Sequence, residues 1–212
     1  MGLFITIEGP DGSGKSTQVE KLAALANKNT NKNNWILTKN PGGTSLGIKI
    51  RKLLLEDTSV NLHPIAELFM YMADRAQHVN EVVKPALKDG KIVICDRFID
   101  STVAYQGYAR GLDKELISNL NNLATQNIKP DLTIILDVSP EIGLKRASLK
   151  YNGSHDKLEA EGLDFQRKVR EGFLELAQKE IRKFRVINTE ELTIEEVHQK
   201  ILEEINVLVA NS

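Results

Sequence analysis

The 212-residue sequence predicts an α/β fold in which helices flank a parallel sheet. Short apolar runs alternate along the chain with longer amphipathic stretches, which is the pattern of successive strand–helix units. The runs are rich in Ile and Val, as expected for strands that are buried on both faces. With 41% hydrophobic residues, the chain can bury a core without disulfides, and its length fits one domain.

Five short apolar runs, each bounded by polar residues or glycine, are predicted to be strands. They are Leu3–Glu8, Trp35–Lys39, Lys91–Cys95, Leu132–Asp137 and Phe184–Ile187. The amphipathic stretches between them predict helices over residues 16–28, 45–55, 65–88, 113–127, 140–149, 158–182 and 193–209. Gly107 and Gly111 indicate a loop, and residues 150–157 interrupt the helical pattern, as a plain loop or a flexible segment over a site would.

Composition and charge exclude several classes of protein. The 28 basic and 29 acidic residues give a net charge of −1, so no nucleic-acid or membrane-surface partner is expected. The single cysteine, Cys95, excludes an internal disulfide framework and a Cys-rich zinc site. No apolar stretch approaches the roughly 18 residues of a membrane span, and Leu3–Ile7 is too short for a signal peptide. We therefore expect a soluble, cytoplasmic domain.

A phosphate-binding motif follows the first predicted strand. The segment Gly9-Pro10-Asp11-Gly12-Ser13-Gly14-Lys15-Ser16 fits the pattern G-x-x-x-x-G-K-S/T and opens a predicted helix. Its backbone N–H groups and the helix N-terminus favour anionic oxygens. Lys15 could reach the terminal phosphates of a nucleotide, and the Ser16 hydroxyl could bind Mg²⁺. A guanine-reading Asn-Lys-x-Asp is not matched by Asn27-Lys28-Asn29-Thr30, which weighs against a GTPase.

A second candidate site lies at the end of the third predicted strand. Asp96 and Arg97 follow an apolar run, and ligands of open α/β sheets bind beyond the carboxyl ends of the strands. Asp96 is therefore placed to act on Mg²⁺, and Arg97 could bind a phosphate through its two-pronged guanidinium group. The alternative for an isolated Asp-Arg pair is a surface ion pair, which the neighbouring phosphate motif disfavours.

Three further groups of side chains have both a functional and a structural interpretation. Tyr71 and Arg75 are one helical turn apart and could offer a stacking ring and a cation, or could be a core aromatic beside a solvated arginine. His78, on the same face, is favoured as a helix-surface or packing residue over a catalytic base. Tyr105 could pack against a sugar, although a lone tyrosine is more often structural. Cations close to residues 150–157 could belong to a lid or to a solvated helix end; they are Arg146, Lys150 and Lys157.

Together these motifs resemble the bacterial thymidylate kinases, P-loop enzymes that phosphorylate dTMP with ATP. Four segments carry the resemblance over nearly the whole chain: Glu8–Thr17, Pro41–Thr44, Ala73–His78 and Asp96–Gly107. The resemblance implies a single three-layer P-loop NTPase domain with a five-stranded parallel sheet and a mobile lid near residues 143–161. It also implies ATP binding by residues 9–17, Mg²⁺ held by Ser16 and Asp96, and a homodimer formed through helices near 45–55 and 65–88.

The resemblance further implies a role for each acceptor-side residue. Asp11 would hold the 3′-hydroxyl of the acceptor nucleotide, and Tyr105 would lie under the sugar and exclude a 2′-hydroxyl. Tyr71 stands where the family usually has a Phe stacked on thymine. Arg75 would contact a base carbonyl and Thr102 the base edge. Arg97 would bind the acceptor phosphate and, with Lys15, stabilise the transferring phosphoryl group.

The chain also departs from the family pattern. Lys39-Asn40 precedes Pro-Gly-Gly-Thr where Arg-Glu is common, and Ser148 and Lys157 stand at lid positions where arginine is frequent. One subgroup carries a basic residue in the phosphate loop, where this chain has Gly12. A catalytic cation is therefore expected from the lid, with Arg146 as the candidate.

Two other functions fit parts of the sequence. One is the same fold acting on another nucleoside monophosphate or on a nucleoside. The other is a nucleotide-sensing module without catalysis, which would have no reason to keep Asp96, Arg97 and a basic lid.

Overall fold

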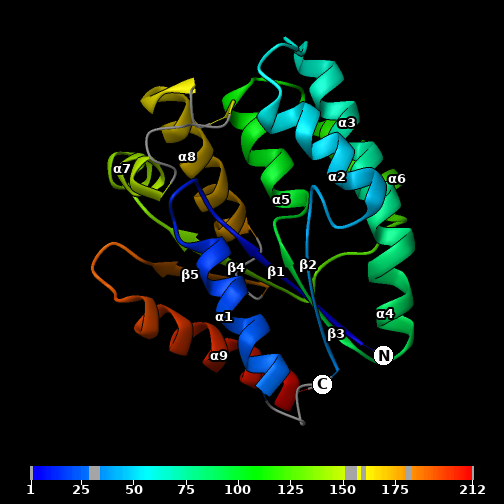
Figure 1. The fold of residues 1–212 in the computed structure, drawn as a ribbon, viewed down its shortest axis with the longest axis vertical. Helices are drawn as coiled ribbons and strands as arrows, with labels where there is room; N and C mark the ends of the chain where they lie inside the picture. Colours follow the sequence, from blue (N-terminus) through cyan, green and yellow to red (C-terminus); the bar gives the residue numbers. More distant parts are fainter. Residues whose placement is uncertain (1, 29–33, 151–156, 159–160, 180–182, 212) are drawn as a thin grey trace.

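Five parallel strands form one sheet in the order β2-β3-β1-β4-β5 (Figure 1). This computed structural model describes residues 2–28, 34–150, 157–158, 161–179 and 183–211. The strands are β1 (Leu3–Glu8), β2 (Trp35–Lys39), β3 (Ile92–Asp96), β4 (Leu132–Asp137) and β5 (Phe184–Asn188). The predicted parallel sheet is confirmed, and the predicted strands match to within one residue at each end.

Helices connect the strands and cover both faces of the sheet. The α-helices are α1 (Lys15–Lys28), α2 (Ser45–Arg51), α3 (Pro64–His78), α4 (Lys84–Lys88), α5 (Ile99–Thr102), α6 (Lys114–Thr125), α7 (Pro140–Lys150), α8 (Leu163–Lys179) and α9 (Ile194–Ala210). Three π-helical segments continue α2, α3 and α5: η2 (Lys52–Glu56), η3 (Val79–Val83) and η4 (Val103–Ala109). The helix predicted over residues 65–88 is therefore formed by α3, η3 and α4, which follow one another without a break.

Two sequence predictions about helices were wrong. The loop predicted at Gly107 is helical, because α5 and η4 run from Ile99 to Ala109 before the chain turns. This stretch contains a glycine and β-branched residues, so its helix propensity is weak, but its burial against α8 overrides that propensity. The packing is close: a Cβ atom on Gly172 of α8 would lie 2.8 Å from the Tyr108 ring. The helix predicted from residue 158 begins only at Leu163, after Gly162 adopts a positive φ of 90°.

The core has a layer on each side of the sheet, as strands buried on both faces require. On one face, Ile5 and Ile7 of β1 pack with Leu22 of α1 and Ile201 of α9. On the other face, Phe4 of the same strand packs with Phe98, while Ile135 of β4 belongs to a cluster with Phe173 of α8 and Leu68 of α3. The order helices–sheet–helices is the predicted three-layer architecture. Within the described ranges, no helix is long and apolar enough to cross a bilayer.

Candidate active site

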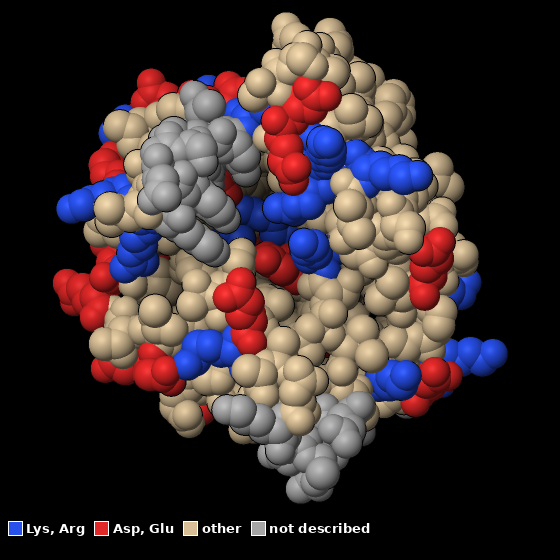
Figure 2. Space-filling view, in the orientation of Figure 1, with Lys and Arg blue, Asp and Glu red and all other residues tan. Residues whose placement is uncertain are grey.

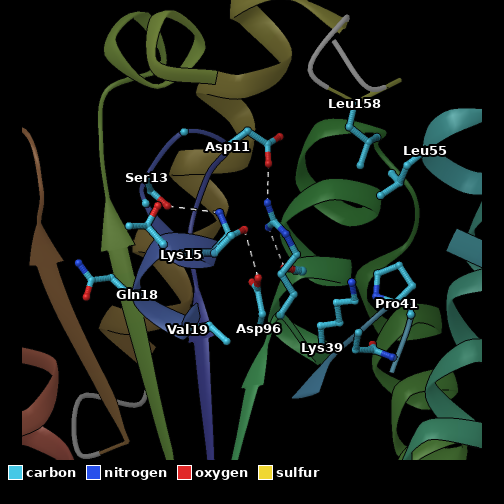
Figure 3. Close-up of a pocket in the computed structure, with 18 of the residues that line it drawn as sticks. Asp11, Ser13, Lys15, Gln18, Val19, Lys39, Pro41, Leu55, Asp96 and Leu158 are labelled. Carbon is cyan, nitrogen blue, oxygen red and sulfur yellow. Dashed lines mark hydrogen bonds and ion pairs between the residues drawn. The ribbon is translucent and has the colours of Figure 1, made fainter. Parts of the chain in front are cut away.

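A cavity of about 1000 Å³ opens at the carboxyl ends of the central strands (Figures 2 and 3). The loop after β1, the segments after β2 and β3, and parts of α3, η4, α7 and α9 line it. Lys and Arg side chains gather around the hollow on this face of the molecule (Figure 2). The net charge of −1 therefore conceals a local concentration of cations.

The structure brings most of the predicted site residues to this one cavity. Its lining includes residues 11–17 of the phosphate loop together with Tyr71, Arg75, Asp96, Arg97, Thr102, Tyr105 and Arg146. Gly9 and Pro10 contribute carbonyl oxygens, which accept hydrogen bonds from Arg97 and Lys15 at 3.0 and 2.7 Å.

The phosphate loop depends on glycine where other backbone approaches it. Gly12 has a φ of 72°, and a Cβ atom there would lie 1.9 Å from the carbonyl oxygen of Gly143 in α7. A Cβ atom on Gly143 would in turn lie 2.4 Å from the carbonyl oxygen of Asp11. The loop and α7 therefore touch backbone to backbone, which only a pair of glycines permits.

Lys15 is buried and held by the loop that it serves. Its ammonium donates to the Pro10 carbonyl at 2.7 Å. It also donates to the Ser13 hydroxyl at 3.3 Å (Figure 3). Burial, together with the positive charge of Arg97, lowers the pKa of Lys15 to about 8. The site thus makes the cation less stable than it is in water, and a bound anion would restore its stability.

The oxygen atoms of Ser16 and Asp96 form a pair that fits Mg²⁺. The Ser16 hydroxyl donates to Oδ2 of Asp96 at 3.4 Å, and the other carboxylate oxygen, Oδ1, is buried without a partner among the described residues. Hard oxygen donors of this kind are those that Mg²⁺ prefers. The described part of the chain contains no group of three or more His, Cys, Asp or Glu side chains that could hold a metal ion. Nucleotide oxygens and water would therefore complete the coordination.

Arg97 links the phosphate loop to the opposite wall. Its backbone is in the left-handed region (φ 67°), which is uncommon for a residue other than glycine, and its side chain reaches back to the loop. One terminal nitrogen donates to the Gly9 carbonyl and to Ser101 at 3.0 and 3.2 Å. The other forms an ion pair with Asp11 and donates to the Tyr105 hydroxyl at 3.2 Å. The guanidinium carbon also lies 5.1 Å from the centre of the Tyr105 ring.

The Asp11 and Arg97 side chains of this cluster both stay ionised at neutral pH. Burial would raise the pKa of Asp11, but the charges of Arg97 and Lys15 hold it below its usual value. Burial would lower the pKa of Arg97, but Tyr105 and Asp11 hold it above its usual value. Gln166 of α8 adds a hydrogen bond to Asp11 at 3.2 Å. A fixed anion and a fixed cation therefore lie side by side at the cavity wall.

Sequence reasoning missed Glu8, which supports this cluster from the end of β1. Glu8 is fully buried and accepts from the Phe98 N–H at 2.7 Å and from the Ser101 hydroxyl at 2.5 Å. Burial raises the pKa of Glu8, although the Ser101 hydrogen bond and the Arg97 charge oppose this. The carboxylate anchors the start of α5 to the end of β1. The sequence did carry a signal for this role, because Glu8 ends an apolar strand directly before a phosphate loop.

The wall formed by α3 and α5 carries the predicted acceptor residues. Tyr71 is buried and lines the cavity, which favours neither interpretation of this residue over the other. Arg75 is a buried cation rather than a solvated one: it donates to Asn40, to Asn121 and to the Phe98 carbonyl at 3.1, 2.7 and 2.9 Å. Burial lowers the pKa of Arg75 to about 10, so it stays charged at neutral pH. The Thr102 hydroxyl lines the cavity and is buried without a partner among the described residues.

His78 supports the packing interpretation. Its Nε2 lies 2.7 Å from the Thr38 hydroxyl, and the side chain is fully buried behind the Pro-Gly-Gly turn, where a Cβ atom on Gly43 would lie 2.6 Å from the ring. Burial, together with the charge of Arg75, lowers the pKa of His78 to about 4. The ring is therefore neutral at physiological pH.

Two of the cations that the sequence assigned to the lid, Arg146 and Lys157, point in different directions. Arg146 lines the cavity, and its guanidinium donates to the carbonyl oxygens of Thr189 and Glu190 at 2.9 and 3.1 Å. The Lys157 ammonium instead donates to the carbonyl oxygens of Leu53 and Val60 at 3.2 and 2.7 Å, beyond the end of α2. In the predicted lid, residues 151–156 and 159–160 lie outside the described residues, as does the side chain of Lys150.

Comparison with known proteins identifies the family. The family described as "Thymidylate kinase" matches residues 7–201. A thymidylate kinase of Maridesulfovibrio salexigens is 46% identical over 96% of both chains, and one of Carboxydothermus hydrogenoformans is 50% identical over 88% of this chain and 89% of its own. A crystal structure of thymidylate kinase from Ehrlichia chaffeensis has a TM-score of 0.78 and 38% identity over 97% of this chain and 100% of that one. The chain therefore belongs to the thymidylate kinase family.

Proposed function

We propose that this cavity transfers a phosphoryl group from ATP to dTMP, giving ADP and dTDP, with Arg97 at the point where donor and acceptor meet. The observation that carries the proposal is the set of Arg97 contacts. This one guanidinium bonds to the phosphate loop through Gly9 and Asp11, and to the opposite wall through Tyr105. A cation shared between two phosphate-binding walls is what a transfer between two nucleotides requires.

The donor side would be the phosphate loop. Residues 9–17 would surround the ATP phosphates, with the Lys15 ammonium turning from the loop carbonyl to the terminal phosphates. Ser16 and Asp96 would hold Mg²⁺, which neutralises phosphate charge when it is bound.

The acceptor side would be the wall of α3 and α5. Tyr71 would stack on thymine, Arg75 would donate to a base carbonyl, and the Thr102 hydroxyl, which has no described protein partner, would reach the base edge. Tyr105 would leave no room for a 2′-hydroxyl. Asp11 would accept from the 3′-hydroxyl, in keeping with its ionised state.

Catalysis would depend on positioning and charge rather than on a base. The acceptor phosphate is already anionic at neutral pH, and the described cavity presents no neutral histidine to it. Lys15 and Arg97 would stabilise the charge on the equatorial oxygens of the transferring group. Arg146 would act as the lid cation by exchanging its bonds to Thr189 and Glu190 for phosphate oxygens.

We further propose a homodimer formed through α2 and α3. Large apolar side chains of α2, α3 and the adjoining η2 are exposed, including Ile48 at 63%, Phe69 at 54%, Leu46 and Leu53. An exposed apolar patch on packed helices is typical of a subunit interface. A cytoplasmic location stays a prediction from the sequence.

A panel of acceptors tests the proposed reaction. With ATP as donor, dTMP should give the highest kcat/KM in an assay coupled to ADP formation. dUMP lacks one methyl group and should be slower by about ten- to a hundredfold. A rate with dTMP no better than with dCMP or AMP would contradict the proposal, and an absence of acceptor-stimulated ADP release would favour the sensing module.

Replacement of the two central cations tests their roles. Lys15→Ala and Arg97→Ala should each lower kcat by about a hundredfold or more, because each removes a charge from the transferring phosphoryl group. Lys21→Ala and Arg167→Ala remove the same charges from surface ion pairs and should leave kcat unchanged. Melting curves verify that all four variants fold. Near-wild-type turnover in either test variant would remove that residue from the mechanism.

The lowered pKa of Lys15 predicts proton uptake on nucleotide binding. With a pKa of about 8, roughly half of the Lys15 side chains are neutral at pH 8, and phosphate binding should protonate them. Affinity for ATP should therefore fall as the pH rises above 8. Titration calorimetry at pH 8, in buffers of different ionisation enthalpy, measures this uptake. Lys15→Arg should abolish the uptake, because arginine does not titrate in this range. Equal heats for the wild type in all buffers would contradict the prediction.

Light scattering tests the dimer. The wild-type chain should show twice its mass of 23.7 kDa, and Ile48→Glu or Phe69→Glu should show the monomer mass, because each buries a charge in the apolar interface. Val207→Glu alters a similarly exposed apolar residue on α9, on the other face of the sheet, and should remain dimeric. A monomeric wild-type protein, or dimers in both test variants, would contradict the interface.

A further inference from the structure

Asn40 lies where three parts of the active site meet. It follows β2 directly, precedes Pro41 of the Pro-Gly-Gly turn, lines the cavity and is only 2% exposed. Its backbone N–H donates to the carbonyl oxygen of Asp96 at 3.0 Å. The residue is thus fixed against the end of β3, and its side chain reaches towards α3.

The Asn40 amide bridges two buried charges of opposite sign. Its NH₂ group donates to Oδ2 of Asp74, and its carbonyl oxygen accepts from Nε of Arg75 at 3.1 Å. A carboxylate can only accept and a guanidinium can only donate, so the partners themselves dictate which way the amide faces. No ionised side chain of this size could satisfy both neighbours.

Each partner of the amide leads to a different part of the site. Asp74 also accepts from the Gly42 N–H at 3.0 Å, which ties the Pro-Gly-Gly turn to α3. Arg75 extends to Asn121 of α6 and to the Phe98 carbonyl. The amide therefore joins the turn after β2 to the cation that lines the acceptor wall.

We propose that Asn40 is a positioning residue for the acceptor nucleotide: its amide orients Arg75 by bonding to it and to Asp74 at once. The inference rests on the proposed role of Arg75 in binding the acceptor base. It assigns a function to the neutral residue that this chain carries before Pro-Gly-Gly-Thr. Burial raises the pKa of Asp74, against the hydrogen bond from Gly42 and the charge of Arg75, so a second carboxylate at this place would be strongly disfavoured.

Asn40→Asp tests the proposal with almost no change of shape. The new carboxylate still accepts from Arg75 but cannot donate to Asp74, and two adjacent carboxylates repel. The KM for dTMP should rise about tenfold at pH 8.5, whereas kcat and the KM for ATP should change by less than about threefold. At pH 6 the ratio of variant to wild-type KM should shrink, because the carboxylate pair takes up a proton and regains a donor.

The charged groups around position 40 indicate that the carboxylate pair is the source of this change of the KM ratio with pH. The charged groups that face it are Asp74 and Arg75 of α3, Arg51 of α2 and Asp96 of β3. Arg75 stays charged between pH 6 and 8.5, since its pKa is about 10, and Arg51 and Asp96 are present in both proteins. His78 remains neutral because its pKa is about 4.

Two further variants separate the possible outcomes. Asn119→Asp makes the same substitution at an exposed position of α6 and should leave every constant unchanged. Asn40→Ala removes both bonds without adding charge. It should raise the KM for dTMP at all pH values equally, and it serves as the test if Asn40→Asp does not fold.

The Arg75→Ala variant distinguishes a failure of the Asn40 inference from a failure of the base-binding role of Arg75 on which it rests. Arg75→Ala should raise the KM for dTMP on its own. If it does not, the base-binding role of Arg75 fails and the inference fails with it. If Arg75→Ala raises that KM while Asn40→Asp and Asn40→Ala behave like Asn119→Asp, only the inference about Asn40 is overturned.

Discussion

The ion pair between Asp11 and Arg97 is the interaction on which the arrangement of the site depends. It joins the loop after β1 to the segment after β3. These two strands are neighbours in the parallel sheet, so their carboxyl ends lie side by side. Both side chains are largely shielded from solvent, so removing either partner would leave a poorly solvated charge without compensation. Glu8 supports the pair from below by fixing the first residues of α5, so that Ser101 and Tyr105 stand where the guanidinium needs acceptors.

The two arginines that line the cavity are held in contrasting ways. Arg97 is held by a carboxylate, a hydroxyl and a phenol, and its charge is locally balanced. Arg75 is held by the oxygens of two amides and a backbone carbonyl, none of which carries a formal charge. An arginine whose partners are neutral keeps more of its positive potential for a ligand, whereas one paired with a carboxylate is fixed more firmly in orientation.

Local patterns in the sequence predicted the strands, the phosphate loop and several of the charged and aromatic residues that line the cavity, whereas Thr102 was implied by the family resemblance. These features depend on short-range rules: β-branched apolar runs for Leu3–Glu8 and Leu132–Asp137, and a spaced glycine-lysine motif for residues 9–16. The errors and omissions depend on distant contacts. Residues 103–109 are helical because they pack on α8, and no local propensity predicts that. The direction of Lys157, towards Leu53 and Val60, follows from a meeting of segments about a hundred residues apart. Glu8 and Asn40 were visible in the sequence, but their functions follow from hydrogen-bond partners that only the fold brings together.

The contact between Gly12 and Gly143 constrains how this sequence can diverge. Each glycine leaves room for the backbone beside the other, since a Cβ atom at either position would overlap a carbonyl oxygen across the contact. A side chain can enter the phosphate loop at position 12 only if α7, which carries Arg146, moves away. Placing a cation in the loop and keeping α7 in its present position are therefore sterically incompatible. Substitutions at positions 12 and 143 should be interdependent in evolution, so that descendants of this chain retain both glycines or change the whole contact together.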